Sequence, residues 1–116
     1  MTEGQPAIRD DPMYQLLREG KIEEFNRRRA AGENVSLAEC DLRGLDLRGL
    51  DARGLDFSNS YFRQADLRGI DLSGSRLEGA SIHAAKISGV YFPAELSPEE
   101  IQLSLEHGTR MRYSRP

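Results

Sequence analysis

The chain has few of the residues that would place it in a secreted, membrane or disulfide-linked class. It has no tryptophan in 116 residues and only one cysteine. Because a disulfide needs two cysteines, an internal disulfide framework is excluded. No apolar run approaches the length that crosses a bilayer. The first thirty positions contain no apolar core of a secretion signal, because charged residues interrupt them: Arg9, Asp10, Asp11 and Arg18. We therefore expect a cytoplasmic protein with no membrane association.

Motifs of catalysis are also missing. Neither GxxxxGK[ST] nor GxGxxG occurs, and the serines have no histidine at a recognisable catalytic spacing. His83 and His107 stand outside any cysteine or carboxylate pattern typical of a metal site, so we expect both at the surface. Cys40 is expected to be a buried core thiol, with a reactive thiol as the alternative. The sequence thus predicts no enzyme, no cofactor and no metal ion.

Neither sign of charge dominates. The chain has 19 acidic and 16 basic residues, and a formal net charge of −3. Within residues 33–94 there are nine acids and seven bases. Aspartates flank the arginines and would repel a phosphate backbone, so nucleic acid is not an expected ligand. The length suits one compact domain.

What the sequence does contain is a period of five residues. Every fifth position from Leu37 to Phe92 is apolar, and among these twelve only Ala52 is small. Neither a helix nor a strand has a period of five, so the pattern indicates a solenoid, whose short units bury their side chains by stacking. The large members of the series form the predicted core: Leu37, Leu42, Leu47, Phe57, Phe62, Leu67, Leu72, Leu77, Ile82, Ile87 and Phe92.

The repeating units are clearest as LDLRG (45–49), ADLRG (65–69) and IDLSG (70–74). On these units the chain resembles the pentapeptide-repeat proteins, whose unit is roughly A(D/N)LXX, over about residues 35–94. The resemblance implies a mainly β fold, namely a right-handed quadrilateral β-helix with four units per coil and about three coils. Side chains 20 residues apart would then stack in interior columns.

The first residue of each unit should also face inward, where small side chains are usual. Leu45, Leu50, Leu55 and Ile70 are large exceptions, and Ala52 lies between two of them. We interpret Ala52 as compensation in volume and expect the first coil to be slightly distorted. Glycine closes seven units, where a corner needs unusual backbone angles: Gly44, Gly49, Gly54, Gly69, Gly74, Gly79 and Gly89.

A solenoid exposes apolar surface at both ends, so both flanks are expected to be helical caps. Asp11 can cap a helix that begins with Pro12 and ends near Gly20, and a second helix is expected over 21–31. The alternative for this hairpin is a separate binding module, similar to the helix pairs of ankyrin-type adaptor repeats. The expected segments are an N-terminal helical hairpin cap, the β-helix, and a C-terminal capping helix with a basic tail: residues 1–32, 33–94 and 95–116.

The C-terminal helix has the sharper signal. Residues 97–100 (SPEE) match a capping box with proline at the first helical position. Leu96 and Ile101 are spaced as a hydrophobic staple around it. The helix is expected to end at about His107, before a glycine, and the basic tail 109–116 is expected to fray.

Aspartate recurs at the second, outward position of six units. Stacking alone would place Asp46 over Asp66 and Asp51 over Asp71, so close carboxylates here do not indicate catalysis. Exposed Asp–Arg pairs contribute only about 0–1 kcal/mol each, and we interpret most of them as solubilising.

For one outward cluster, solubility is not the only role that the sequence suggests. If residues 20 apart stack, Arg43 lies over Arg63 and Arg48 lies over Arg68. Tyr61 would stand beside Arg63. Arginine and tyrosine together are typical of interface hot spots. We expect this patch to contact an acidic protein partner.

The sequence therefore predicts a non-enzymatic protein-interaction or scaffold module that binds through the outward faces of the β-helix. Some pentapeptide-repeat proteins act as DNA mimics on type II topoisomerases such as gyrase, and the resemblance leaves this role as the alternative. A structural subunit of a larger assembly is a third possibility. The sequence does not decide between a monomer and a dimer.

Overall fold

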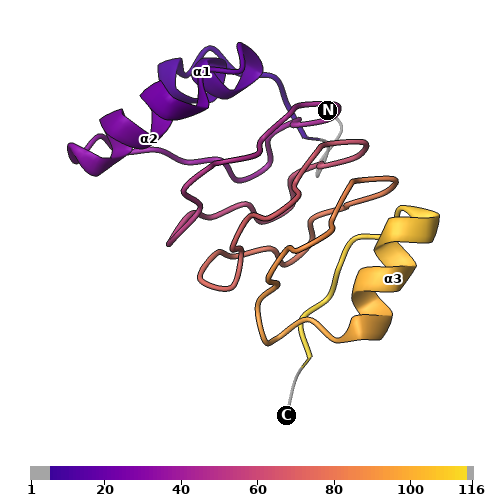
Figure 1. The fold of residues 1–116 in the computed structure, drawn as a ribbon. Coiled ribbons are helices and arrows are strands. Elements are labelled where there is room, and N and C mark those ends of the chain that lie inside the picture. Colours follow the sequence, from indigo (N-terminus) through magenta and orange to yellow (C-terminus); the bar gives the residue numbers. More distant parts are fainter. Residues whose placement is uncertain (1–5, 115–116) are drawn as a thin grey trace.

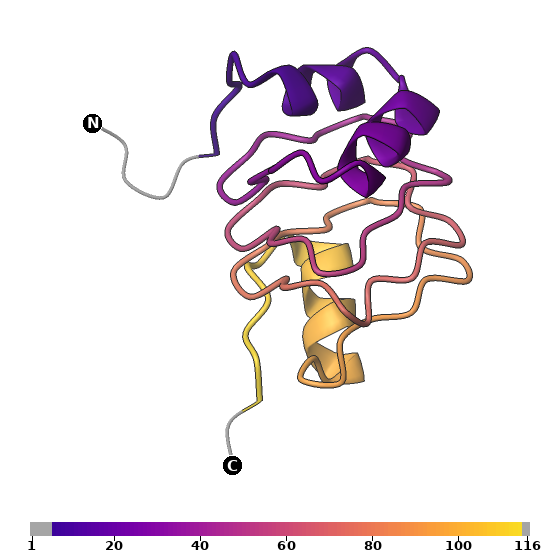
Figure 2. The ribbon, with the colours of Figure 1, turned by 90° about the vertical axis from the view of Figure 1, so that its left-hand side faces the viewer.

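The computed structural model describes residues 6–114; residues 1–5 of the expected hairpin segment and 115–116 of the expected tail lie outside the described residues. The described chain contains three α-helices, α1 (Pro12–Arg18), α2 (Ile22–Ala30) and α3 (Pro98–His107), and no extended β-strand. Between α2 and α3 the backbone winds in stacked turns (Figure 1). In both views α1 and α2 lie at one end of this stack and α3 at the other (Figures 1 and 2).

The turns are joined by isolated parallel bridges between residues 20 apart, the separation that four five-residue units per turn require. A typical contact is the pair of hydrogen bonds from Tyr61 N to Cys40 O at 3.0 Å and from Leu42 N to Tyr61 O at 2.8 Å. The bridges fall on second positions of the units: Asp41–Tyr61, Tyr61–Ser81, Asp46–Asp66, Asp66–Lys86, Asp56–Arg76 and Asp71–Tyr91.

Every fifth side chain points into the stack. Of the eleven predicted core residues, nine are at most 1 % exposed. Within the core the rings of Phe57 and Phe62 meet edge to face, with centroids 5.1 Å apart. Ile87 and Phe92, in the last turn, are only half-buried. The core thus extends through the stack but is incompletely covered near residue 90.

The fifth position of each unit forms the corner. Its backbone is left-handed from Glu39 to Gly89, with the exception of Gly74. Glycine adopts this conformation without a steric penalty. Gln64 and Ala84 adopt it at φ 60° and 58° despite the steric penalty that a side chain brings. The corner conformation is therefore imposed by the stack even where glycine is absent.

One face of the stack is irregular. Within residues 6–114 no bridge joins Asp51 to Asp71, although Gly54 N on the same face donates to Gly74 O at 3.0 Å. The Ser75 hydroxyl donates to Ala52 O at 2.6 Å, as the Ser60 hydroxyl does to Leu37 O at 2.6 Å. Leu50 and Leu55 are both buried, at 6 % and 3 % exposed, and their bulk flanks this position.

The N-terminal helices contact the first turn. The Asp11 carboxylate accepts from Met13 N and Tyr14 N, which begins α1 as expected. Tyr14 is fully buried, and its hydroxyl donates to Asp41 O at 2.6 Å. Tyr14 lies three residues before Leu17, on the same face of α1, but the sequence alone does not indicate its hydrogen bond to Asp41 O. Ahead of α1, Ala7 pairs with Cys40 as a further parallel bridge.

The C-terminal segment contacts the last turn. Ser97 caps α3, and Gly108 ends it at φ 77°, as expected. The expectation that the tail frays is wrong for residues 109–114. Met111 is fully buried and pairs with the last turn, because its N donates to Ala80 O at 2.8 Å and its O accepts from Gly79 N at 2.7 Å.

Candidate protein-binding surface

Most outward arginines are neutralised inside their own unit. In a representative unit, Arg68 Nε and Nη2 donate to the Asp66 carboxylate at 2.9 and 2.7 Å, and Asp66 Oδ1 accepts from Arg68 N at 3.2 Å. The aspartate therefore fixes the local turn and pairs with the arginine two residues later. Four units share this Asp-x-Arg arrangement: Asp41–Arg43, Asp46–Arg48, Asp51–Arg53 and Asp66–Arg68.

These contacts hold the carboxylates ionised. Hydrogen bonds from Arg53 and Arg68 lower the pKa of Asp51 and of Asp66 from 3.8 to about 2. Burial raises the pKa of Asp41, but hydrogen bonds from Arg43 outweigh it, so the net direction is downward. At neutral pH each such pair has no net charge, and it offers little electrostatic attraction to a partner.

Arg63 is different because its unit, SYFRQ, has Tyr61 where the others have aspartate. Its guanidinium lies over the Tyr61 ring, with Cζ 4.3 Å from the centroid. Arg63 Nε donates to Ser81 Oγ and Nη2 to Gly108 O, both at 3.3 Å. Within residues 6–114 no carboxylate lies within 4.0 Å of this guanidinium. The charge of Arg63 is thus fixed in place by neutral groups.

The predicted patch therefore consists of two electrostatically different parts. Arg48 and Arg68 share the carboxylates of Asp46 and Asp66, with Arg48 Nε 3.4 Å from Asp66 Oδ2. The other part surrounds the tyrosine, and its second cation was missed by the sequence analysis: Arg110 Cζ lies 5.4 Å from the Tyr61 ring centroid. No repeat spacing signals Arg110, since it belongs to the tail. Arg43 is paired with Asp41 and so belongs with the neutralised arginines. We call Tyr61, Arg63 and Arg110 the tyrosine surface.

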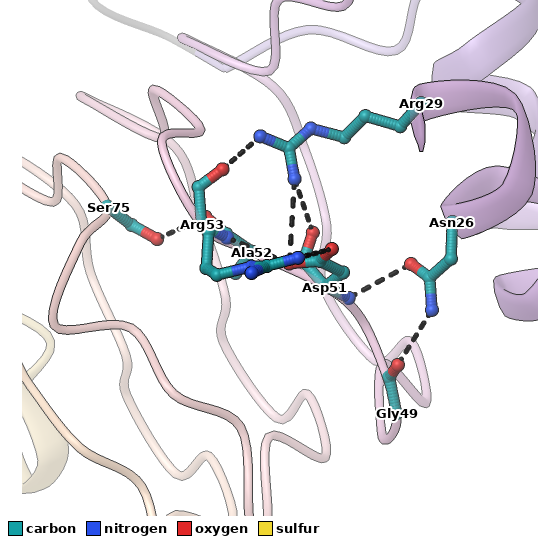
Figure 3. Close-up of polar contacts among 7 residues, drawn as sticks. All are labelled: Asn26, Arg29, Gly49, Asp51, Ala52, Arg53 and Ser75. Atoms are coloured by element: carbon teal, nitrogen blue, oxygen red, sulfur yellow. Dashed lines mark hydrogen bonds and ion pairs between the residues drawn. The ribbon is translucent and has the colours of Figure 1, made fainter. Parts of the chain in front are cut away.

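At the opposite end of the stack, side chains of α2 bond to the backbone of the first turn, where a preceding turn would otherwise form the hydrogen bonds (Figure 3). The Asn26 amide donates to Gly49 O and accepts from Asp51 N, each at 2.9 Å. Arg29 Nη1 lies 3.6 Å from the Asp51 carboxylate and donates to Asp51 O at 3.0 Å, while its Nη2 donates to Arg53 O. The polar groups here serve the attachment of α2, so they do not form a free binding site.

The cysteine and the two histidines were the remaining candidates for chemistry. Cys40 is fully buried, and burial raises the pKa of its thiol. His107 is exposed. The expectation that His83 is a surface residue is wrong: it is half-buried, and its Nδ1 is buried without a hydrogen-bond partner. The reason is Gly108, which packs against the His83 side chain after α3 ends. Among residues 6–114 no three potential metal ligands lie close enough to hold an ion.

In the part of the chain that the structure describes, no helix has the length and apolar character needed to cross a membrane.

Comparison with known proteins bears on the repeat alone. No curated protein and no solved structure matches the chain. The family model for pentapeptide repeats (8 copies) matches residues 33–69 and 56–92, a stretch of more than half the chain that carries the five-residue units described above. The protein therefore belongs to the pentapeptide-repeat family.

Proposed function

We propose that the chain is a non-enzymatic protein-interaction module. Its repeat is a right-handed quadrilateral β-helix of about three coils, capped by α1 and α2 at one end and by α3 at the other. The bridges between residues 20 apart and the buried fifth positions support this architecture. With the interior filled by side chains, a partner is bound through the outward faces.

The tyrosine surface is the binding site that we favour on these faces. The observation that carries this choice is the position of Arg63, stacked on Tyr61 with no carboxylate partner among the described residues. Arginine and tyrosine held in place lose little conformational entropy on binding, and both are enriched at hot spots. An uncompensated guanidinium favours an acidic group of a protein partner.

The test is affinity capture from native lysate, quantified by mass spectrometry, with matched charge reversals. Arg63→Glu should abolish enrichment of the partner. Arg53→Glu is the control, because Arg53 is exposed on another face and bonded to Asp51. Thermal unfolding of both variants verifies the fold. Equal capture by wild type and Arg63→Glu would remove the tyrosine surface from the proposal.

The face chemistry does not favour the DNA-mimic role on gyrase. A mimic of the duplex needs strongly negative faces, whereas four of the aspartates at second positions are paired with arginines of the same units. A supercoiling assay with purified gyrase addresses this alternative directly, since inhibition or drug protection at micromolar protein would restore it.

A further inference from the structure

The described residues complete only half of the hydrogen bonding at the end of the stack beside α3. On two faces of the last turn, backbone N–H groups donate to atoms of α3 and of the tail. These contacts take the place of a fourth turn. They are Leu77 N to Tyr113 Oη at 2.8 Å, Gly79 N to Met111 O at 2.7 Å, Ile82 N to Ser104 Oγ at 3.0 Å, and Ala84 N to Leu105 O at 3.0 Å.

On the other two faces, residues 85–92, these backbone groups have no such partners in the part of the chain that the structure describes. The N–H groups of Ile87, Gly89 and Phe92 and the carbonyls of Ala85 and Val90 form no hydrogen bond to any group within residues 6–114. The same groups one turn earlier are all paired, which shows that they point toward the open end. The earlier bonds are Leu67 N to Lys86 O, Gly69 N to Ser88 O, Leu72 N to Tyr91 O, Lys86 N to Ala65 O and Tyr91 N to Ile70 O.

Apolar side chains accompany these unpaired groups. Ile87, Val90 and Phe92 occupy inward positions yet remain only half-buried. Tyr91 is 69 % exposed. An unpaired edge with an apolar surface is a template for another extended segment. We call residues 85–92 the open edge.

The charge of Lys86 indicates which segment fits. Lys86 is exposed, and within residues 6–114 no carboxylate pairs with it. Its neighbour in the preceding turn, Asp66, is held by Arg68 and Arg48. Two copies meeting through their open edges would bring two Lys86 side chains to one interface, which is unfavourable. An acidic side chain beside Lys86 is favourable.

We propose that the open edge binds one extended segment of a protein partner, with an acidic residue beside Lys86 and a large apolar residue next to it over Ile87. The segment adds to the stack as a further turn would, through backbone hydrogen bonds to Ile87 and Gly89. This inference rests on the proposed role as an interaction module, but it uses a surface separate from the tyrosine surface.

The probe is a labelled synthetic peptide with the sequence of residues 65–74, ADLRGIDLSG, which repeats the acidic–apolar pair at five-residue spacing. Titration of the full chain should give saturable fluorescence anisotropy. In NMR spectra the amides of Ile87, Gly89 and Phe92 should gain protection from hydrogen exchange. The amides of Ile82 and Ala84, already bonded, should not change.

Charge reversal makes the test specific. Lys86→Glu should lower the affinity for the peptide about 3- to 10-fold. A peptide with lysine at both aspartate positions should restore the affinity of this variant. Arg53→Glu is the matched control and should bind like wild type. A peptide N-methylated at both aspartates should lose binding, since it cannot donate to Ala85 O and Val90 O.

Three results would overturn the proposal: no saturation up to millimolar chain, equal affinity of wild type and Lys86→Glu, or equal affinity of the N-methylated peptide. If light scattering showed instead a dimer that protects the same amides, the edge would belong to a second copy. Loss of capture by Arg63→Glu concerns only the tyrosine surface, so the two proposals succeed or fail separately.

Discussion

At the scale of the residue, the repeat assigns each position a physical task. The third residue fills the interior, the second anchors the local turn, and the fifth makes the corner. Leu67, in the interior, is 1 % exposed, whereas the neighbouring Arg68 is outward and bonded to Asp66. Aspartate recurs for a local reason, since Asp66 accepts from the backbone and side chain of the same arginine.

The inward and outward positions can be separated by two neighbouring substitutions. Leu67→Ala should lower the free energy of unfolding by about 2–5 kcal/mol, because it leaves a cavity in a closed core. Arg68→Ala should stay within about 0.5 kcal/mol, because an exposed ion pair contributes little. Urea unfolding measures both. Similar losses for the two variants would show that the side-chain orientation is wrong.

At the corner position, a substitution is expected to raise the free energy of unfolding rather than lower it. Ala84 holds a left-handed backbone at φ 58°, which costs an L-residue energy that glycine does not lose. Ala84→Gly should therefore raise the free energy of unfolding by about 0.5–1 kcal/mol. Gly79→Ala is the counterpart and should lower it, because its Cβ would collide with Asn59. Destabilisation by Ala84→Gly would contradict this corner geometry.

At the scale of the element, the helices complete hydrogen bonds that the stack leaves open at its ends. Asn26 of α2 presents one donor and one acceptor to the first turn, as a preceding turn would. At the last turn, Ser104 Oγ and Leu105 O of α3 both accept, from Ile82 N and Ala84 N. α3 bonds to the face formed by residues 80–84, and the tail bonds to the face formed by residues 75–79. The open edge is the part of the last turn that neither segment pairs.

Asn26→Ala tests the role of α2. The substitution removes both hydrogen bonds to Gly49 and Asp51 and should cost about 1 kcal/mol of unfolding free energy. Amide exchange at Asp51 should become faster at the same time. Arg27→Ala, an exposed neighbour, should change neither quantity measurably. Unchanged exchange at Asp51 in Asn26→Ala would contradict the contact.

The helices were predictable because their ends have local chemical signals. A helix was expected over 21–31 and is found at Ile22–Ala30, and α3 ends at His107 as its following glycine predicts. The ordered tail was not predictable, because Met111 is held by a backbone edge formed by residues 79 and 80. For the same reason the sequence could not place Arg110 over Tyr61. The sequence shows aspartates two residues before Arg43, Arg48 and Arg68, but spacing alone does not reveal how fully each pair is neutralised.

At the scale of the whole molecule, charge pairs cover a stack whose interior is apolar. The pKa of Asp51 and of Asp66 is lowered to about 2 by hydrogen bonds from arginines. A depressed pKa contributes stability that is present above the unfolded value of 3.8 and is lost as pH falls toward 2.

Stability should therefore change little through these groups from pH 7 to pH 4 and fall between about pH 4 and pH 2. Urea unfolding as a function of pH measures this slope. Asp51→Asn combined with Asp66→Asn should flatten the slope in that window. Parallel profiles of the variant and wild type would show that these carboxylates keep ordinary pKa values.

The central claim is that side chains and backbone groups 20 residues apart in sequence lie side by side. Nuclear Overhauser contacts in solution test it most directly. The account predicts backbone contacts between Asp41 and Tyr61, and between Asp66 and Lys86, with none of the i, i+3 contacts of a helix through residues 40–90. Helical i, i+3 contacts across that range, without contacts between residues 20 apart, would contradict it.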